Sequence, residues 1–559
     1  MRSTTVLQLV FLVAVVGCGA GESVSQPQKS VNGQFDRWST SGHLSPSRMP
    51  MEMSSRAMSA GLGDAGLADP NAQRQPDHNT EAYDRIDDNP FLTVRQNPLS
   101  TFSIDVDTAA YANVRRFLND GQLPPKDAVR IEELLNYFTF DYPQPDGDAP
   151  FSITADVARC PWKPEHRLVR IRLKGRDIPV EQRPPSNLVF LIDVSGSMQP
   201  ANKVPLLKAA MALLVEQLRE QDRVAIAVYA GASGLVLPST SGDNKPAILS
   251  ALDRLNAGGS TNGAAGIQLA YDVAKANHIR GGINRVILAT DGDFNVGVTS
   301  QGELTRLIEE RARSGVFLTV LGFGMGNYKD STLEKLADRG NGNYAYIDSL
   351  SEARKVLVEQ AAGTLLTIAK DVKIQVEFNP AKVNGYRLIG YENRMLRAED
   401  FNNDQKDAGE IGAGHTVTAL YEVVPVGRDV PAVAVDPLKY QPAAEPAAAN
   451  PSDELLTVKV RYKAPDEDVS RLLSVPLMDR ETRTDQVTAD WQFAAAVAAF
   501  GLLLRDSPYK GEATWDAVLE LAEAGVGTDR AGHRAEFVKL ARQARTVSHR
   551  VADASRRRD

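Results

Sequence analysis

Cysteine is almost absent from this chain, which has two in 559 residues. Cys18 lies in the N-terminal segment, so Cys160 is the one cysteine left for everything that follows. A single thiol excludes an internal disulfide there, and packed cores must stabilise the fold instead. We expect Cys160 to be buried at a strand end without a reactive role, because only His166 lies nearby as a base and no catalytic cysteine pattern surrounds it.

The sequence also lacks a strongly basic region and the motifs of several enzyme classes. Its net charge of −8, from 63 basic and 71 acidic residues, argues against a nucleic-acid partner. Gly-x-Ser-x-Gly, Walker and His-Glu-x-x-His patterns are missing. The hydrophobic content of 43% and charged content of 24% are ordinary for a globular protein, and the length predicts about three or four folded units.

No apolar run near the N-terminus is long enough to cross a bilayer, which takes about twenty residues. The run Val6 to Val16 follows Arg2 and leads to Val-Val-Gly-Cys18, which resembles a bacterial lipoprotein signal over residues 1–18. In that case Cys18 is acylated and its acyl chains anchor the protein to a membrane. The alternative is an ordinary secretory signal in which Cys18 has no role.

Gly19 after the cysteine resembles lipoproteins that are sorted to the outer membrane, so we expect a lipid-anchored protein of the bacterial cell envelope, at the outer membrane or cell surface. Residues 19–89 are rich in Ser, Gly, Met, Gln, Asn and Asp and show no sustained periodicity. This composition predicts a disordered tether over 19–89.

The most informative residues that are present follow predicted strands. Asp193, Ser195 and Ser197 end one strand, Thr261 lies in a glycine-rich loop before a helix, and Asp291 follows another strand. In an open parallel α/β sheet, ligands gather beyond the carboxyl ends of the strands, so these loops can share one rim. Hard oxygen ligands of this kind suit Mg²⁺. Ser-Gly-Ser or Asp-Gly alone is more often a turn, so the prediction depends on all five residues together.

These five residues resemble the metal-ion-dependent adhesion site (MIDAS) of the von Willebrand factor A (vWA) domain. The resemblance implies that Ser195, Ser197 and sometimes Thr261 bind the metal, while Asp193 and Asp291 hold its water molecules. It implies Mg²⁺, with Ca²⁺ or Mn²⁺ as alternatives. Because neutral hydroxyl ligands leave the cation electron-poor, it gains most from an Asp or Glu carboxylate of a protein partner.

The order of predicted strands and helices indicates the fold class. Residues 185–365 alternate between them, which predicts an α/β, Rossmann-like vWA domain with a mostly parallel, doubly wound sheet. Candidate strands in a β-rich flank, 149–184, and in a β-rich C-terminal domain, 366–480, predict a β-sandwich that the vWA domain interrupts or adjoins. Residues 90–148 and 481–559 are expected as an N-terminal accessory helical segment and a C-terminal helical element. These parts resemble the accessory domains of a group of bacterial vWA lipoproteins.

Within the N-terminal segment, the periodicity predicts a helix over 109–119 and a second helix that Asp127 caps and that runs to Phe138. Asp105 and Asp107 alternate with apolar residues. We interpret them as the polar face of a strand that ends in a helix cap, in preference to a catalytic pair.

The sequence therefore predicts a surface-tethered, non-enzymatic adhesion or scaffolding module that captures a partner's acidic residue through a divalent cation. Two alternatives stay open: a metal-dependent hydrolase, although no histidine stands near the motifs, and a structural envelope protein whose cation only stiffens loops. Because the site is expected on a rim outside the core, Asp193→Ala or Thr261→Ala should remove magnesium-dependent binding and leave the fold largely intact.

Overall fold

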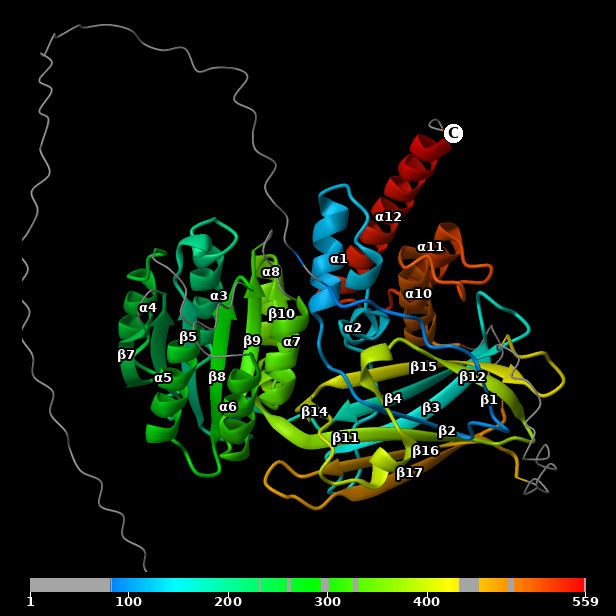
Figure 1. The fold of residues 1–559 in the computed structure, drawn as a ribbon, viewed down its shortest axis with the longest axis horizontal. Coiled ribbons are helices and arrows are strands. Elements are labelled where there is room, and N and C mark those ends of the chain that lie inside the picture. The colour runs from blue at the N-terminus through cyan, green and yellow to red at the C-terminus, as the bar shows by residue number, and fades with distance from the viewer. Residues whose placement is uncertain are drawn as a thin grey trace, which may run out of the picture. The chain divides into compact units, whose positions relative to one another are not determined.

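The computed structural model describes Glu81 and residues 83–230, 233–258, 263–292, 301–324, 330–431, 452–480 and 487–556. They all belong to one compact unit, Arg74–Asp559. Within this unit an α/β domain, two β-sheets and a group of helices can be followed along the chain in Figure 1. Thr261 and Cys18 lie outside the described residues.

The α/β domain is built on a six-stranded sheet in the order β10-β9-β8-β5-β6-β7. All neighbouring strands are parallel except the edge strand β7, which runs antiparallel to β6. Every residue of β5 and β8 is buried, as expected for central strands of a sheet covered on both faces. The strands are β5 (Ser186–Asp193), β6 (Arg223–Tyr229), β7 (Ser233–Ser241), β8 (Ile283–Thr290), β9 (Phe317–Phe323) and β10 (Tyr344–Ile347).

Helices cover both faces of this sheet. One hydrophobic core joins it to α3 (Val204–Glu216), α4 (Lys245–Asp253) and α8 (Leu350–Arg354). A second core lies on the opposite face of the sheet. There the alternate side chains of the same strands pack with α5 (Gly263–Ala276), α6 (Gln301–Arg313) and α7 (Asp330–Arg339). The predicted doubly wound α/β class is therefore confirmed.

Two further sheets face each other across a third core of Val, Ile, Leu, Phe and Tyr side chains, which makes them a β-sandwich. The first sheet has the order β1-β12-β15-β4-β3, with β1 (Leu92–Thr93), β12 (Val383–Ile389), β15 (Thr416–Pro425), β4 (Arg167–Gly175) and β3 (Phe151–Arg159). The second has the order β13-β2-β11-β16-β17, with β13 (Met395–Leu396), β2 (Leu99–Ser103), β11 (Thr367–Phe378), β16 (Glu454–Lys463) and β17 (Arg471–Met478). A short strand, β14 (Gly409–Gly412), also pairs with β11.

The α/β domain is an insertion in this sandwich. The chain leaves the first sheet at the end of β4, forms β5 to β10, and enters the second sheet with β11. The predicted interruption of one β-sandwich by the α/β domain is what the structure shows.

The N-terminal and C-terminal helices share one core although they are far apart in sequence. It contains side chains of α1 (Ala109–Asn119), α2 (Ile131–Asn136), α10 (Ala489–Leu504), α11 (Trp515–Ala524) and α12 (His533–Arg556). Aromatic contacts cross between the two groups, with Phe138 next to α2 lying 4.7 Å from Phe493 of α10 between ring centroids. Short 3₁₀ turns complete the chain at η1 (Lys126–Ala128), η2 (Val180–Gln182), η3 (Gly196–Met198), η5 (Glu392–Arg394) and η6 (Ala398–Asn402).

Three local expectations need correction. Asp127 does not cap a helix to Phe138; it lies in η1, and α2 begins only at Ile131 after Arg130. The periodicity of the sequence also predicts one helix over residues 351–362 at the end of the α/β domain, but this segment is divided into α8, a π-helical turn η4 (Lys355–Glu359) and α9 (Ala361–Leu365). A π turn inserts an extra residue, which a helical periodicity of 3.6 does not reveal.

The folded part also begins earlier than the predicted boundary at residue 90. The Glu81 carboxylate is almost fully buried and pairs with Arg116 at 2.9 Å, and the hydroxyl of Tyr83 accepts a hydrogen bond from Asn113. The polar composition of these residues predicted a disordered tether. Instead, contacts with α1, such as the ion pair between Glu81 and Arg116, hold them against the folded part.

Cys160 is a buried free thiol directly after β3, as predicted. Burial raises its pKa well above the usual value, which disfavours the reactive thiolate. Among the helices that the structure describes, none combines the length and the apolar character needed to cross a membrane.

Candidate functional site

Parallel strands bring the first predicted site residues to one edge of the α/β sheet. Asp193 is the last residue of β5 and lies opposite Tyr229, the last residue of β6. On the other side β5 pairs with β8, whose last residue, Thr290, precedes Asp291. The carboxyl ends of these three strands lie at one edge of the sheet. This edge is the rim at which the sequence predicts a metal site.

Asp193 is held in one orientation by three hydrogen bonds. Its Oδ1 accepts the backbone amide of Ser195 at 2.8 Å, and its Oδ2 accepts the hydroxyls of Tyr229 and Thr290 at 3.2 Å each. The side chain is completely buried, and burial, together with the nearby charge of Asp291, raises the pKa of its carboxyl group. This carboxylate is therefore buried at the rim, whereas the sequence predicted a position outside the core.

The two serine hydroxyls lie side by side. Ser195 Oγ and Ser197 Oγ are 3.0 Å apart; Ser195 is buried and Ser197 is partly exposed. Neighbouring corners of an octahedron with metal–oxygen bonds of about 2.1 Å lie roughly 3.0 Å apart. The hydroxyl pair therefore has the spacing that two adjacent ligands of Mg²⁺ require, and these residues fit the metal.

Asp291 is paired with a lysine that the sequence did not indicate. Lys203 Nζ lies 2.8 Å from Asp291 Oδ2, and both side chains are buried. Lys203 directly precedes α3, the helix that follows the Ser195–Ser197 loop. No periodicity or motif could have singled it out, since one Lys before a helix is usually solvated.

Thr261 was predicted as the fifth site residue, and its position lies outside the described residues. The described residues on either side are close to the rim. The amide of Gly258 donates to the carbonyl of Val194 at 2.7 Å, and α5, which starts at Gly263, packs on β5 and β6. We call Asp193, Ser195, Ser197, Asp291 and Lys203 the rim site.

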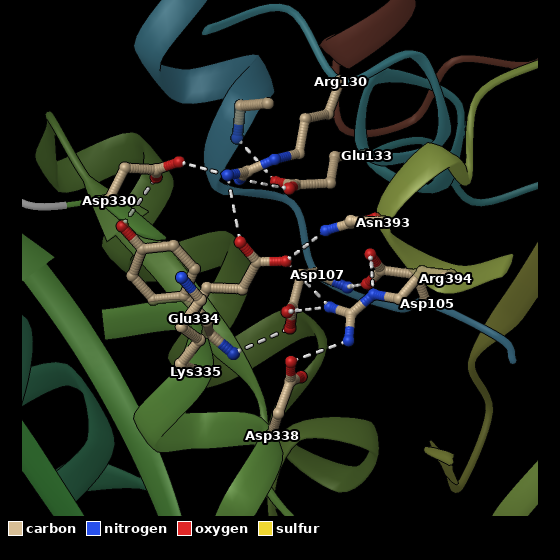
Figure 2. Close-up of polar contacts among 12 residues, drawn as sticks. Asp105, Asp107, Arg130, Glu133, Asp330, Glu334, Lys335, Asp338, Asn393 and Arg394 are labelled. Atoms are coloured by element: carbon tan, nitrogen blue, oxygen red, sulfur yellow. Dashed lines mark hydrogen bonds and ion pairs between the residues drawn. The ribbon is translucent and has the colours of Figure 1, made fainter. Parts of the chain in front are cut away.

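A second group of carboxylates lies where three parts of the chain meet (Figure 2). Ligand oxygens of Asp105, Asp107 and Glu334 lie within 4.8 Å of one another, and all three side chains are buried. Asp105 and Asp107 precede α1, and Glu334 is on α7 of the vWA domain. Such a cluster can hold a cation, but here the protein itself supplies positive charge.

The guanidinium of Arg394, in η5, lies among these carboxylates. Its nitrogens lie 3.0 Å from oxygens of Asp105 and Glu334, 3.5 Å from Asp107 and 2.7 Å from Asp338. The arginine thus links the N-terminal segment, the vWA domain and the strand region after β12.

Arg130, before α2, provides the second guanidinium. It pairs with Glu133 at 2.9 Å, with Asp330 at 2.7 Å and with Glu334 at 3.0 Å. Six carboxyl groups thus face two guanidiniums in what we call the junction network, which consists of Asp105, Asp107, Arg130, Glu133, Asp330, Glu334, Asp338 and Arg394.

Burial and carboxylate repulsion change the titration of this network. They raise the pKa of Glu334 to about 7, although both arginines act in the opposite direction. Burial also raises the pKa of Asp107 well above the usual value, with repulsion from Asp105 as the next cause. Protonation of part of the network therefore offsets the excess of negative charge.

The interpretation of Asp105 and Asp107 as the polar face of a strand is wrong. β2 ends at Ser103, and both aspartates are buried, with Asp107 accepting the backbone amide of Tyr344 in the vWA domain at 2.8 Å. The network was missed because Arg130, Glu334 and Arg394 are widely separated along the chain and no local pattern connects them.

Comparison with known proteins agrees with this architecture. A family model of the von Willebrand factor type A domain matches residues 187–360, one described as von Willebrand factor matches 77–170, and one described as the C-terminal part of the uncharacterized protein YfbK matches 363–547. Uncharacterized protein YfbK of Escherichia coli (strain K12) is 47% identical over 468 residues, which cover 82% of this chain and 80% of that protein. The chain belongs to the YfbK family. This chain therefore joins a vWA domain to a C-terminal YfbK domain as parts of one compact unit.

Two further similarities are more distant. Inter-alpha-trypsin inhibitor heavy chain H4 of Homo sapiens is 28% identical over 225 residues, 38% of this chain and 24% of that protein. The solved structure of von Willebrand factor type A from Catenulispora acidiphila has a TM-score of 0.39 at 16% identity, over 71% of this chain and 91% of that one. Domains of the vWA family are in general protein-interaction modules, and many bind a divalent metal at the MIDAS.

Proposed function

We propose that this protein captures a protein partner through a divalent cation at the rim site and has no catalytic role. The observation that carries the proposal is the pair of hydroxyl oxygens of Ser195 and Ser197, 3.0 Å apart at the carboxyl end of β5. Ser197 is partly exposed, so a ligand at this edge can be reached from solvent.

The chemistry of the ligands determines the kind of partner. Two neutral hydroxyls bring no negative charge to the ion, and the proposed role of Asp193 and Asp291 is to hold water molecules around it. A cation in this setting gains most from an anionic oxygen of another molecule. We therefore propose a partner that presents Asp or Glu, with Mg²⁺ as the metal and Ca²⁺ or Mn²⁺ as substitutes.

We also propose that acylated Cys18 anchors the protein to the bacterial cell envelope, at the outer membrane or cell surface. The support is the lipoprotein-like segment at residues 1–18. Cys18→Ala should move the full-length protein from the membrane pellet to the soluble fraction. If the variant stays in the pellet after a salt wash, the anchoring proposal is wrong.

The central experiment is a pull-down from envelope extract with the parent protein as bait, in Mg²⁺ and in EDTA. We expect partners that bind in Mg²⁺ and are lost in EDTA or with Ser197→Ala, because that variant removes one hydroxyl ligand. Ser250→Ala is the matched control, since Ser250 is exposed on α4. It should capture the same partners as the parent.

The carboxylate requirement can be tested on the captured protein itself. After its carboxyl groups are amidated, it should no longer bind in Mg²⁺. Equal capture in EDTA and Mg²⁺ would instead support a structural role for the protein, and magnesium-dependent ester hydrolysis that is lost with Ser197→Ala would support the hydrolase alternative.

A further inference from the structure

Lys203 is the feature of the rim site that the proposed function does not use. Its ammonium lies 2.8 Å from Asp291, one of the two carboxylates proposed to hold the metal's water molecules. The lysine side chain is 7% exposed and that of Asp291 is fully buried. The pair therefore lies inside the protein, where charge interactions are stronger than at a solvated surface.

The fold provides a fitted space for the lysine stem. Gly324 follows β9, and a Cβ on it would lie 2.2 Å from Lys203 Cε and 2.6 Å from its Cγ. Gly324 has a φ of +81°, and its carbonyl accepts the hydroxyl of Tyr346 at 2.5 Å. Only a residue without a side chain leaves room here, so the stem is directed along a fixed path to Asp291.

The lysine backbone is fixed as well. Its amide donates to the carbonyl of Pro200, and its carbonyl accepts the amide of Leu207 in the first turn of α3. Because α3 follows the loop that carries Ser195 and Ser197, the serines and the ammonium are positioned by consecutive segments of chain.

We infer that Lys203 is a resident cation of the rim site, which neutralises Asp291 before a divalent ion arrives and thereby weakens the site's affinity for that ion. This inference rests on the proposed metal site and adds the residue that limits the site's affinity for the divalent ion. A divalent ion must either share Asp291 with the ammonium or displace it, and two like charges near one carboxylate repel each other. Affinity is thus limited by a side chain that is not itself a ligand.

The test is isothermal titration of the full chain with MgCl₂, after treatment with EDTA and dialysis. Lys203→Met keeps the length of the stem and removes its charge, and we expect its Kd for Mg²⁺ to be at least about tenfold lower than that of the parent. The matched control is Lys208→Met. Lys208 lies further along α3 and donates to the carbonyl of Asp253, so its Kd should stay within about twofold of the parent's.

Thermal unfolding gives an independent readout. In EDTA, Lys203→Met should have a lower Tm than the parent, because Asp291 has lost its buried cation. Mg²⁺ should raise the Tm of this variant by more than it raises that of the parent. If Lys203→Met fails to fold, Lys203→Gln replaces it, since its neutral amide can still donate to Asp291 and the lost charge should also tighten Mg²⁺ binding.

The outcomes separate this inference from the proposed function. If the parent binds Mg²⁺ and the variant binds it equally or more weakly, Lys203 does not oppose the metal and the inference is overturned. If Lys203→Met tightens Mg²⁺ binding but no partner is captured in Mg²⁺, the inference stands and the proposed capture function fails. If neither the parent nor any variant binds Mg²⁺, both the inference about Lys203 and the proposed function are wrong.

Discussion

The rim site and the junction network both bury carboxylates, but they balance the charge in different ways. At the rim, the ammonium of Lys203 pairs with Asp291, and the nearby oxygens of Ser195 and Ser197 are neutral hydroxyls. In the junction, two guanidiniums each pair with several carboxylates from different segments. A guanidinium has a rigid set of donors and stays charged, whereas an ammonium is a point charge that can give up a contact more easily.

This difference indicates what each cluster does. The junction network uses fixed protein charges to hold three parts of the chain together, so its carboxylates already have arginine partners. The rim site keeps hydroxyl oxygens near solvent, and among the described residues the ammonium of Lys203 pairs with Asp291, an arrangement that suits the proposed entry of a mobile cation. The larger number of buried acidic residues would favour the junction network as a metal site. The kind of positive group paired with those residues favours the rim site instead.

The largest expected effect is the loss of Arg394. Arg394→Met leaves Asp105, Glu334 and Asp338 without a shared cation, and removing one partner of a buried ion pair costs about 3–5 kcal/mol. We expect a clear fall in the midpoint of urea unfolding. Arg397→Met is the control, because Arg397 is three residues further on, 75% exposed, and pairs at the surface.

If both variants unfold at the same urea concentration, the junction network is no more important to stability than a surface ion pair. The comparison with the rim site would then lose its basis.

A smaller effect is expected at the rim from Asp193→Ala. The change removes the acceptor of the Ser195 amide and of the Tyr229 and Thr290 hydroxyls, and unsatisfied buried donors cost roughly 1–3 kcal/mol. We therefore expect a measurable loss of stability, where the sequence alone predicts a largely intact fold, and Asp193→Asn, which keeps an acceptor, is the better variant. Both should lose Mg²⁺ binding in calorimetry, with the asparagine variant closer to the parent in Tm. A Tm for Asp193→Ala equal to that of the parent would show that these hydrogen bonds contribute little.

The smallest effect concerns pH and Glu334. Its pKa is about 7 in the folded protein against 4.5 as the ordinary value, so the folded state keeps a proton that the unfolded chain releases between these values. Its contribution to stability therefore falls as pH rises through this window and is level above it. Glu334→Gln cannot release a proton, so its Tm should rise relative to that of the parent between pH 4.5 and 7.

The parent and Glu334→Gln should be compared across pH 4.5–8 by thermal unfolding. His415, whose pKa is lowered to about 4, changes stability in the opposite direction below pH 6.5, but this contribution is common to both proteins and cancels. Parallel profiles would mean that Glu334 is ionised throughout.

Local patterns predicted the elements of the α/β domain closely. The sequence pattern predicts strands over residues 223–229, 317–323 and 344–347, and these are the bounds of β6, β9 and β10. The agreement is close because buried parallel strands are nearly continuous apolar runs. The Asp-x-Ser-x-Ser pattern likewise predicted neighbouring hydroxyls, since three residues of one turn need no distant contact to meet.

Features that depend on distant residues could not be predicted in this way. Lys203 meets Asp291 only because β8 and α3 lie at the same edge of the sheet, and Arg394 meets Asp105 across almost three hundred residues of chain. The common core of Phe138 and Phe493 has the same origin. Amphipathic periodicity shows that a helix has a buried face, but it does not identify the partner of that face.

The insertion of the vWA domain gives it two covalent connections to the sandwich. The chain departs after Gly175, whose amide donates to the carbonyl of His415, and it returns at Thr367, which pairs with Gly412. The two connections therefore meet the sandwich at neighbouring points. Tension applied to the vWA domain divides between two peptide strands, and a protease that cuts one of them leaves the domain attached by the other.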